Sequence, residues 1–308
     1  MNKKELYLLR FAVLFIGVLC LFSCTKEIPF DSQASTPKIV INSLFTTDSV
    51  WSAHISRSRN ITEGTSDYGL PDATVSVYDE NGTLVTSLEH QGEGYYVSPS
   101  LAVPQANQNY RIEASASGFE SVDATNYIPI EVPILQIDTV SNYNDEGELI
   151  MQITLNFNDP SGTDNYYIVE TVVKGSYFDP EIGDSAEFAV PMILTSSDPN
   201  IESINRVGIG GQNFGFEYLM LRDNAFSGQS YALTFSVRNY EDVKDLELIG
   251  EIKLVNTSKE YFDYLSSFLR YQRTQGNPFS TPVQVFSNVN NGMGIFAGGT
   301  INSWELQF

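Results

Sequence analysis

The chain has 308 residues and a formal net charge of −21, with 17 Lys and Arg against 38 Asp and Glu. Such an acidic field repels nucleic acid and bare anionic lipid, so we expect no nucleic-acid partner. Hydrophobic residues make up 42% of the chain and aromatic residues 12%, which is typical of a globular protein and excludes a disordered one.

The N-terminus has the pattern of a secretory signal peptide. A basic segment, residues 3–10, precedes an apolar run, residues 11–22, that is too short to span a bilayer. The run ends in the sequence LFSC, which resembles the bacterial lipobox. The resemblance implies cleavage between Ser23 and Cys24, loss of residues 1–23 and a palmitate-type lipid on Cys24. The alternatives are an ordinary secretory signal or an uncleaved anchor helix.

Cleavage changes what the composition predicts. It removes three basic residues and one acidic residue, so the net charge becomes −23. Cys20 is lost as well, which leaves Cys24 as the only cysteine, and neither a disulfide nor a catalytic thiol is expected. Residues 24–37 are polar, contain two prolines and have no periodicity, so they are predicted to form a lipidated tether.

Residues 38–130 are predicted to form a β-sandwich. Short alternating runs separated by turn residues give about seven strands: 39–41, 51–56, 73–78, 84–88, 95–97, 110–116 and 120–127. The pattern over 73–119, with Gly94-Tyr95-Tyr96 and Gly118-Phe119, resembles the prealbumin-type, carboxypeptidase-regulatory-like sandwich. The predicted fold class is therefore mainly all-β, beginning with an Ig-like or prealbumin-like sandwich.

Residues 131–308 are predicted to form a second β-rich domain after a proline-containing linker, 128–133. Strands are expected over 152–157, 166–173, 231–238 and 251–255, and surface loops with one or two short strands over 175–215. The chain is expected to close with a hairpin, 283–289 paired with 294–298 around an Asn-Gly turn.

One amphipathic helix is predicted over 258–274. Thr257-x-x-Glu260 is a capping box, and an aromatic-rich stripe follows at helical spacing: Tyr261, Tyr264, Leu265, Phe268 and Leu269. We expect this stripe to pack on the sheet of its own domain. Docking of another protein is the alternative.

Several C-terminal motifs carry a family resemblance. They are Asn277-Pro278-Phe279, Pro282-Val283, Ser287-Asn288-Val289 and Asn291-Gly292-x-Gly294-Ile295-Phe296. With the lipobox, the Asn158-Asp159-Pro160 turn and the predicted helix, they resemble a Bacteroidota lipoprotein family, domain of unknown function 4249, over essentially the whole mature chain. The resemblance implies an outer-membrane lipoprotein that often accompanies TonB-dependent transporters, and it carries over no catalytic or ligand residue. Lys26 and Glu27, just after Cys24, favour a surface-exposed protein over a periplasm-facing one.

The motifs for catalysis and cofactor binding are weak. Gly292-x-Gly294-x-x-Ala297 matches a dinucleotide-binding string, but β-formers follow where a helix is needed. The two histidines, His54 and His90, have no cysteine partner for zinc, and no Gly-x-Ser-x-Gly motif is present. We therefore expect no cofactor, no metal and no catalytic residue.

Carboxylates leave one alternative open. The chain has many carboxylates, so their number does not exclude a glycosidase-type catalytic pair. The candidates are Asp159 with Asp164, or the group Asp179, Glu181, Asp184 and Glu187. Calcium binding through the oxygens of the second group is a further alternative, although this group lacks the spacing of a calcium loop. We expect the carboxylates of both groups to lie in solvent-exposed loops without a catalytic role.

The leading functional hypothesis is a non-enzymatic lipoprotein anchored in the outer membrane. It would act as a binding or accessory module beside a TonB-dependent transporter, with a glycan or peptide as a further ligand. The alternatives are a carboxylate-dependent glycan or peptide hydrolase and a structural or adhesive envelope protein. Abundant aromatic residues, 17 Tyr and 19 Phe, are compatible with each of these functions.

Overall fold

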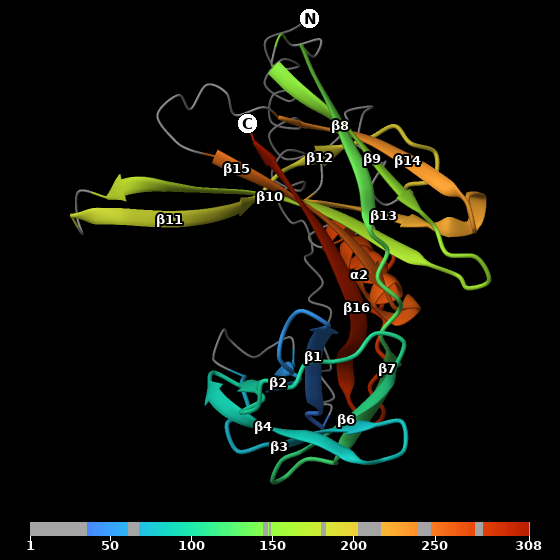
Figure 1. The fold of residues 1–308 in the computed structure, drawn as a ribbon. Helices are drawn as coiled ribbons and strands as arrows, with labels where there is room; N and C mark the ends of the chain where they lie inside the picture. Colours follow the sequence, from blue (N-terminus) through green and yellow to red (C-terminus); the bar gives the residue numbers. More distant parts are fainter. Residues whose placement is uncertain are drawn as a thin grey trace, which may run out of the picture. The chain divides into compact units, whose positions relative to one another are not determined.

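The computed structural model describes residues 36–60, 68–143, 147, 149–179, 183–202, 217–238, 248–274 and 280–307. Pro37–Phe308 forms one compact unit, which is mainly β, as the sequence predicts (Figure 1). The predicted signal peptide, including Ser23 and Cys24, lies outside the described residues. None of the described helices has the length and apolar character needed to cross a bilayer.

All seven strands predicted for the first sandwich are present. They are β1 (Ile39–Thr46), β2 (Ser52–Arg57), β3 (Thr74–Asp79), β4 (Leu84–Gly92), β5 (Tyr95–Val97), β6 (Asn109–Ser115) and β7 (Val122–Tyr127). Alternate residues point inward, as in β1, where Ile39 and Ile41 are fully buried. Phe45 packs there on Trp51, with ring centroids 5.1 Å apart, and a first hydrophobic core forms.

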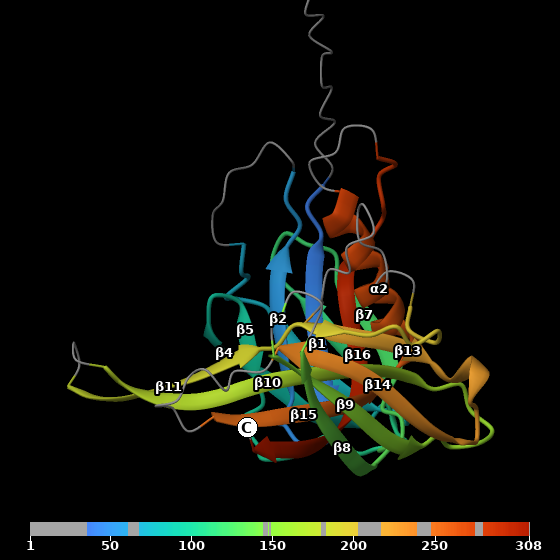
Figure 2. The same ribbon diagram turned by 90° about the horizontal axis from the view of Figure 1, so that it is seen from above.

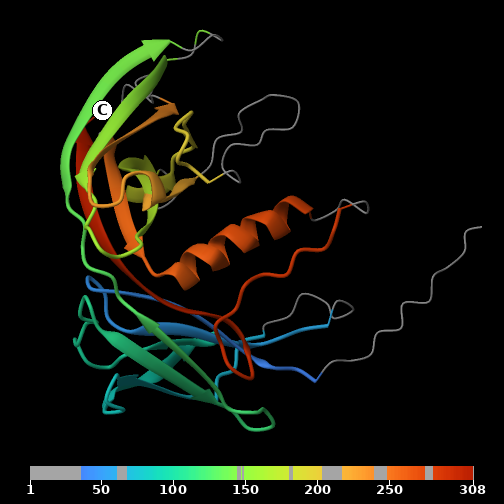
Figure 3. The same ribbon diagram turned by 90° about the vertical axis from the view of Figure 1, so that its right-hand side faces the viewer.

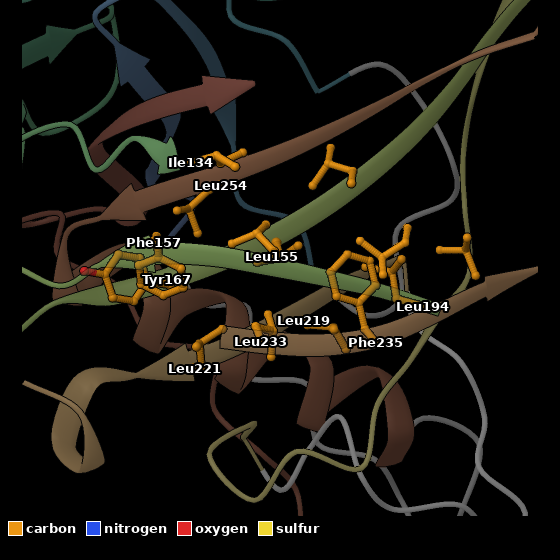
Figure 4. Packing of buried hydrophobic residues seen from close by; sticks show 14 of the residues in the cluster. Ile134, Leu155, Phe157, Tyr167, Leu194, Leu219, Leu221, Leu233, Phe235 and Leu254 are labelled. Carbon is orange, nitrogen blue, oxygen red and sulfur yellow. The ribbon is translucent and has the colours of Figure 1, made fainter. Parts of the chain in front are cut away.

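The second half of the unit contains nine strands and two helical segments within the described residues. They are β8 (Ile134–Tyr143), β9 (Leu149–Asn158), β10 (Tyr166–Asp179), β11 (Asp184–Pro191), β12 (Leu194–Thr195), β13 (Tyr218–Arg222), the 3₁₀ helix η3 (Asp223–Ala225), β14 (Ser230–Arg238), β15 (Leu248–Thr257), α2 (Lys259–Thr274) and β16 (Met293–Gln307). β12, β14, β9 and β8 form a four-stranded sheet, and its inner face covers β10, β13 and β15. A second core fills this space, with Phe157 and Phe235 from one sheet against Tyr167 and Leu254 from the other (Figure 4).

β16 belongs to both halves. Its first part, Met293–Gly299, pairs in parallel with β1, and its second part, Gly299–Gln307, pairs antiparallel with β15. One twelve-stranded sheet therefore continues from the first half into the second.

The predicted C-terminal hairpin is wrong. Residues 283–289 form no strand, although the turn at Asn291-Gly292 is present. The Asn288 carboxamide takes the place of a backbone ladder, because it donates to the Phe296 carbonyl at 2.7 Å and accepts from the Phe296 N–H at 3.0 Å. The backbone of β16 is thereby left to pair with β1.

The stretch predicted as mostly loops, 175–215, begins with regular structure. β10 continues to Asp179 and pairs with β11 as a long hairpin, drawn as the yellow-green pair of arrows in Figure 2. Gly175 permits this, because the Phe188 ring lies over it, and an added Cβ would come within 2.7 Å of that ring. Polar residues extend as strands here because β10 supplies a partner along the whole length of β11.

The predicted linker is held by side chains of β15 and β16. The Ile130 carbonyl accepts hydrogen bonds from Asn256 Nδ2 at 3.0 Å and from Thr300 Oγ1 at 3.1 Å. Asn302 Oδ1 accepts from the Ile134 N–H at 2.9 Å. The division into 38–130 and 131–308 stays a prediction, and the structure adds that Phe296 of β16 belongs to the first core.

We expect the parallel pairing of β1 with β16 to be disrupted when Gly294 is replaced. A Cβ there would lie 2.0 Å from the Ile41 carbonyl oxygen, at a backbone φ of +103°. We expect Gly294→Ala to lower the free energy of unfolding by about 3 kcal/mol or more, measured by urea denaturation. Gly82→Ala is the matched control, because Gly82 has φ +78° but no atom within 4 Å, and it should cost about 1–2 kcal/mol. Equal losses in the two variants would contradict the close approach of the strands.

Candidate functional site

Asp159 and Asp164 do not form the free carboxylate pair that the hydrolase alternative needs. Asp159 is buried, and its carboxylate accepts hydrogen bonds from Tyr167 Oη at 2.5 Å and from the Gly228 N–H at 2.8 Å. Asp164 lies exposed in the turn between β9 and β10. The Asp159 carboxylate therefore ties this turn to the loop after η3.

The second acidic group lies on the β10–β11 hairpin. Asp184 and Glu187 are exposed on β11, and Asp184 Oδ1 accepts from the Ser185 N–H at 2.7 Å. The side chain of Asp179 and the whole of Glu181 fall outside the described residues. In the part of the chain that the structure describes, no group of three or more His, Cys, Asp or Glu is arranged to hold a metal ion.

The two histidines support the backbone around β5. His54 Nε2 lies 3.1 Å from the Glu93 carbonyl oxygen, and the Gly94 N–H donates to His90 Nε2 at 3.2 Å. Their rings also contact Tyr95 and Tyr96, with centroids 4.7 Å and 5.2 Å apart. Both histidines therefore contact the backbone and the tyrosine rings of this hairpin.

A polar hollow of about 360 Å³ lies on the outer face of β3, β6 and β7. Its two carboxylates already have partners, since Arg111 pairs with Glu113 and Asn290 Nδ2 donates to Asp123 at 3.0 Å. The Arg111 guanidinium also lies over the Tyr78 ring, 4.9 Å from its centroid. Its charged groups are therefore mutually satisfied, which makes this hollow a weak candidate.

The helix α2 forms where the sequence predicts, beside β16 (Figure 3). Its buried residues are Phe262, Ser266 and Leu269, and Phe262 packs against Tyr166 with ring centroids 5.4 Å apart. The predicted packing stripe is confirmed in part, because Leu269 is buried and Tyr261 and Leu265 pack against the same cluster. Tyr264 and Phe268 are partly exposed and lie outside that cluster. Positions 262, 266 and 269 share one face, and both this face and the neighbouring aromatic face have helical spacing. Periodicity alone could not choose between them.

The predicted capping box is also corrected. Ser258 caps the helix, since its Oγ accepts from the Tyr261 N–H at 3.4 Å. Thr257 Oγ1 instead donates to the Gly298 carbonyl at 3.2 Å, and Glu260 accepts from Asn126 Nδ2 at 2.9 Å. The side chains expected to cap the helix therefore hold its N-terminus against β16 and β7.

An aromatic row, defined as Tyr261, Tyr264 and Phe268, lies partly exposed beside the buried face, and Tyr261 also packs against the cluster that contains Phe262. Tyr261 and Tyr264 have ring centroids 6.4 Å apart, and Tyr264 and Phe268 have centroids 6.1 Å apart with their planes 4° from parallel. Tyr271, which is 39% exposed, follows Phe268 by three residues. The row is pre-ordered, because its rings contact one another.

Glu170 stands near the aromatic row. It lies on β10, with Tyr218 of β13 and Lys253 of β15 as its cross-strand neighbours. Its carboxylate forms no hydrogen bond or ion pair with a described residue, and the Lys253 ammonium lies 3.7 Å from Glu251. Burial raises the pKa of Glu170, and the charge of Lys253 opposes this in part. A Glu in the middle of the apolar run 166–173 was the sequence signal that could have identified this residue.

The tyrosines around Glu170 stay neutral at physiological pH. Burial raises the pKa of Tyr261 to about 12, with smaller contributions from Glu170 and Tyr264. The pKa of Tyr218 is also raised, first by burial and then by Tyr261, Glu217 and Glu170. The site thus offers aromatic surface, phenolic hydroxyls and one carboxylate. Such a combination can recognise a peptide segment or a sugar.

Comparison with known proteins identifies the family but not the activity. The family model described as "Domain of unknown function (DUF4249)" matches residues 25–304, so the chain belongs to this family. No curated protein matches.

One solved structure with a partial likeness is described as "Complete structure of manganese lipoxygenase of Gaeumannomyces graminis and partial structure of zonadhesin of Komagataella pastoris". It has 10% sequence identity and a TM-score of 0.18, over 88% of this chain and 93% of that one. A likeness at this level carries no argument about fold or function.

Truncation of two phenylalanines should separate the buried face of α2 from its exposed row. Phe262 is fully buried, so Phe262→Ala is expected to lower the free energy of unfolding by about 3–5 kcal/mol. Phe268 is partly exposed and lies outside the buried cluster that contains Phe262, so Phe268→Ala should cost less, about 1–2 kcal/mol. Urea denaturation of both variants measures the difference. A loss for Phe268→Ala as large as that for Phe262→Ala would place the row in the core.

Stability should depend on pH in opposite ways at Glu170 and Glu251. The pKa of Glu170 is raised, so its ionised form costs stability at neutral pH and its protonated form does not. We expect Glu170→Gln to raise the melting temperature at pH 7.5. The gain should begin to shrink as the pH falls below the pKa of the folded state and should vanish below the pKa of the unfolded state.

Glu251 is the control for this experiment. Burial favours a higher pKa there, but the ion pair with Lys174 at 2.7 Å and the charge of Lys253 outweigh it, and the pKa of Glu251 is lowered. Glu251→Gln should therefore lower the melting temperature at pH 7.5, with the loss disappearing only below the folded pKa. Parallel pH profiles for the two variants would refute the assignment of Glu170.

Proposed function

We propose that this member of the DUF4249 family is a non-enzymatic, lipid-anchored accessory protein that docks on a membrane protein through the aromatic row and Glu170. The observation that carries the proposal is the division of α2. One face is buried by Phe262 and Leu269, and the neighbouring face presents three stacked aromatic rings beside a carboxylate without a described partner. Tyrosines that are apolar on the ring and wet at the hydroxyl are enriched among residues that dominate protein interfaces.

The anchor in this proposal is Cys24. The lipobox resemblance supports a lipidated cysteine, and two or more acyl chains hold a protein firmly on a membrane. A tether over residues 24–37 reaches at most about 45 Å when fully extended. The body would therefore stay close to the outer membrane, where tethering raises its effective concentration near an integral membrane partner.

The proposed partner is a TonB-dependent transporter, and the proposed location is the cell surface. Both rest on the family resemblance that the sequence motifs carry. The acidic chain, at −21, is repelled by anionic lipid, which favours a protein partner over flat adsorption to the membrane.

Co-isolation from native membranes tests both parts of the proposal. We expect the full-length protein, extracted in mild detergent, to bring down one outer-membrane barrel. The double variant Tyr264→Ala/Phe268→Ala should reduce recovery of that barrel about tenfold or more, as the loss of about 1.4 kcal/mol of binding free energy would. Tyr143→Ala is the control, because Tyr143 is 74% exposed on β8 and lies outside the row.

A further variant tests the anchor separately. Cys24→Ala should abolish palmitate labelling. The protein should then be released from the membrane fraction, and it should no longer bring down the barrel. Labelling that persists in Cys24→Ala would refute lipidation at this residue. Equal recovery of the barrel with the double variant and with wild type would refute docking through the row.

A hydrolase is the second candidate, and Glu170 is the observation that favours it. A partly buried carboxyl with a raised pKa is the usual form of a general acid. Its cross-strand neighbours are Tyr218 and Lys253, however, and neither supplies the second carboxylate of a glycosidase. Turnover of a glycan or peptide panel that Glu170→Gln abolishes would reverse the ranking.

A further inference from the structure

Four polar side chains lie together at one end of the second core. This buried polar cluster is defined as Asp159, Asn165, Asp223 and Asn256, and its members are 5%, 4%, 2% and 1% exposed. The cluster borders Tyr167, whose ring belongs to the second core (Figure 4) and whose hydroxyl donates to Asp159.

The strand register brings these residues together. Tyr167 pairs with Asn256 of β15 and with Leu221 of β13. Asn165, immediately before β10, therefore lies beside Asp223, immediately after β13. The Asp223 N–H donates to the Asn165 carbonyl at 3.2 Å, and Asn256 Nδ2 donates to Asn165 Oδ1 at 3.3 Å. Asp159 reaches the same place from the turn after β9 and accepts from Tyr167 Oη at 2.5 Å.

Two buried oxygens of the cluster accept no hydrogen bond from a described residue. They are Asp223 Oδ2 and Asn256 Oδ1. Neither Asp159 nor Asp223 forms an ion pair with a described residue. The basic residue next in sequence, Arg222, lies on the other face of the sheet, where it bonds to Glu202 and lies over the Phe262 ring.

A buried carboxylate without a counter-charge is expensive, so the cluster needs either a proton or a cation. Among the described residues no basic side chain pairs with either carboxylate of the cluster, and Asp223 Oδ2 and Asn256 Oδ1 accept no hydrogen bond. A cation bound between these oxygens would supply the missing counter-charge.

We propose that the buried polar cluster binds one hard divalent cation of the calcium type. Every candidate donor is an oxygen: the carboxylates of Asp159 and Asp223 and the carboxamide oxygen of Asn256. Carboxylate and carbonyl oxygens are the ligands of Ca²⁺, which accepts flexible geometry, while thiolate or imidazole metals find no ligand here. The site is independent of the aromatic row, so it stands or falls separately from the proposed function.

The position of the cluster assigns the cation a structural role. Asn256 also donates from Nδ2 to the Ile130 carbonyl at 3.0 Å, in the segment that connects β7 with β8. A bound ion would join the turn after β9, the segment η3 and strand β15, and Asn256 links them to this connection. Calcium should therefore stabilise the junction between the two cores.

The test uses the full-length protein in detergent, treated with EDTA and titrated with CaCl₂ up to about 10 mM, above the range of extracellular calcium modules. We expect a saturable rise in melting temperature for wild type and for the control Asp184→Asn, whose carboxylate is exposed on β11. Asp223→Asn should weaken the calcium midpoint about tenfold or more. Because Asp223 Oδ2 accepts no hydrogen bond from a described residue, this variant is expected to fold, and far-ultraviolet circular dichroism checks it.

Terbium luminescence gives a readout that needs no aspartate variant. Tb³⁺ bound in the cluster should be excited through Tyr167, and Ca²⁺ should displace it. Tyr167→Phe should remove this tyrosine-excited emission.

A melting temperature that calcium leaves unchanged, an equal shift in Asp223→Asn, or emission that calcium does not displace would overturn the site. A wild-type stability that calcium does not change but that Asp223→Asn increases at pH 7 would show that the carboxyls share a proton instead.

Discussion

The fold depends on the close approach of β16 to β1. Gly294 makes this approach possible, because any Cβ there would meet the Ile41 carbonyl, and Gly298 does the same toward β7, where a Cβ would lie 2.3 Å from the Tyr127 carbonyl. Beyond these glycines the same strand pairs with β15 and enters the second half of the unit. The first and last described strands are thus joined in one ladder. This pairing is non-local, and such pairings form slowly because the loop must close before its contacts stabilise the sheet. The position of α2 rests on this ladder as well, since Thr257 bonds to the Gly298 carbonyl.

The parts of the fold that the sequence predicts are those set by local patterns. All seven strands of the first sandwich follow from alternation and turn residues, and α2 follows from helical spacing and a polar N-terminus. The failures come from distant partners. The Asn-Gly turn predicts a local hairpin, but β1, at the opposite end of the chain, takes the edge of β16 that a hairpin would use. The extension of β10 and the presence of β11 depend in the same way on mutual pairing, and their Asp- and Ser-rich composition alone predicts loops.

The candidate site shows the same limit at the level of single side chains. The aromatic row was visible in the sequence, but its spacing predicted a place in the core, because Tyr261, Tyr264 and Phe268 recur as the residues of a packed face do. Phe262, next to Tyr261, packs on Tyr166 and occupies the centre of the buried face. Tyr261 packs at the edge of this face, and Tyr264 and Phe268 are left partly exposed. Sequence patterns gave almost no indication of Glu170. Its environment is set by the flanking strands β13 and β15 and by the ion pair of Lys253 with Glu251, which local sequence patterns do not reveal.

The acidic residues show how neighbours decide what a carboxylate does. Glu251 is held ionised by Lys174, Asp159 is buried under hydrogen bonds from Tyr167 and Gly228, and Glu170 is half-buried without a described partner. All three side chains end in a carboxyl group, so their chemistry alone does not distinguish their roles. Accessibility then limits what can satisfy a carboxylate that the chain leaves unpaired. Glu170 lies near a half-exposed surface, which a macromolecule or an oligomeric ligand can reach. Asp223, at 2% exposure, can be reached only by a proton, a water molecule or a small ion, and the oxygen-only surroundings of its carboxylate favour a hard cation.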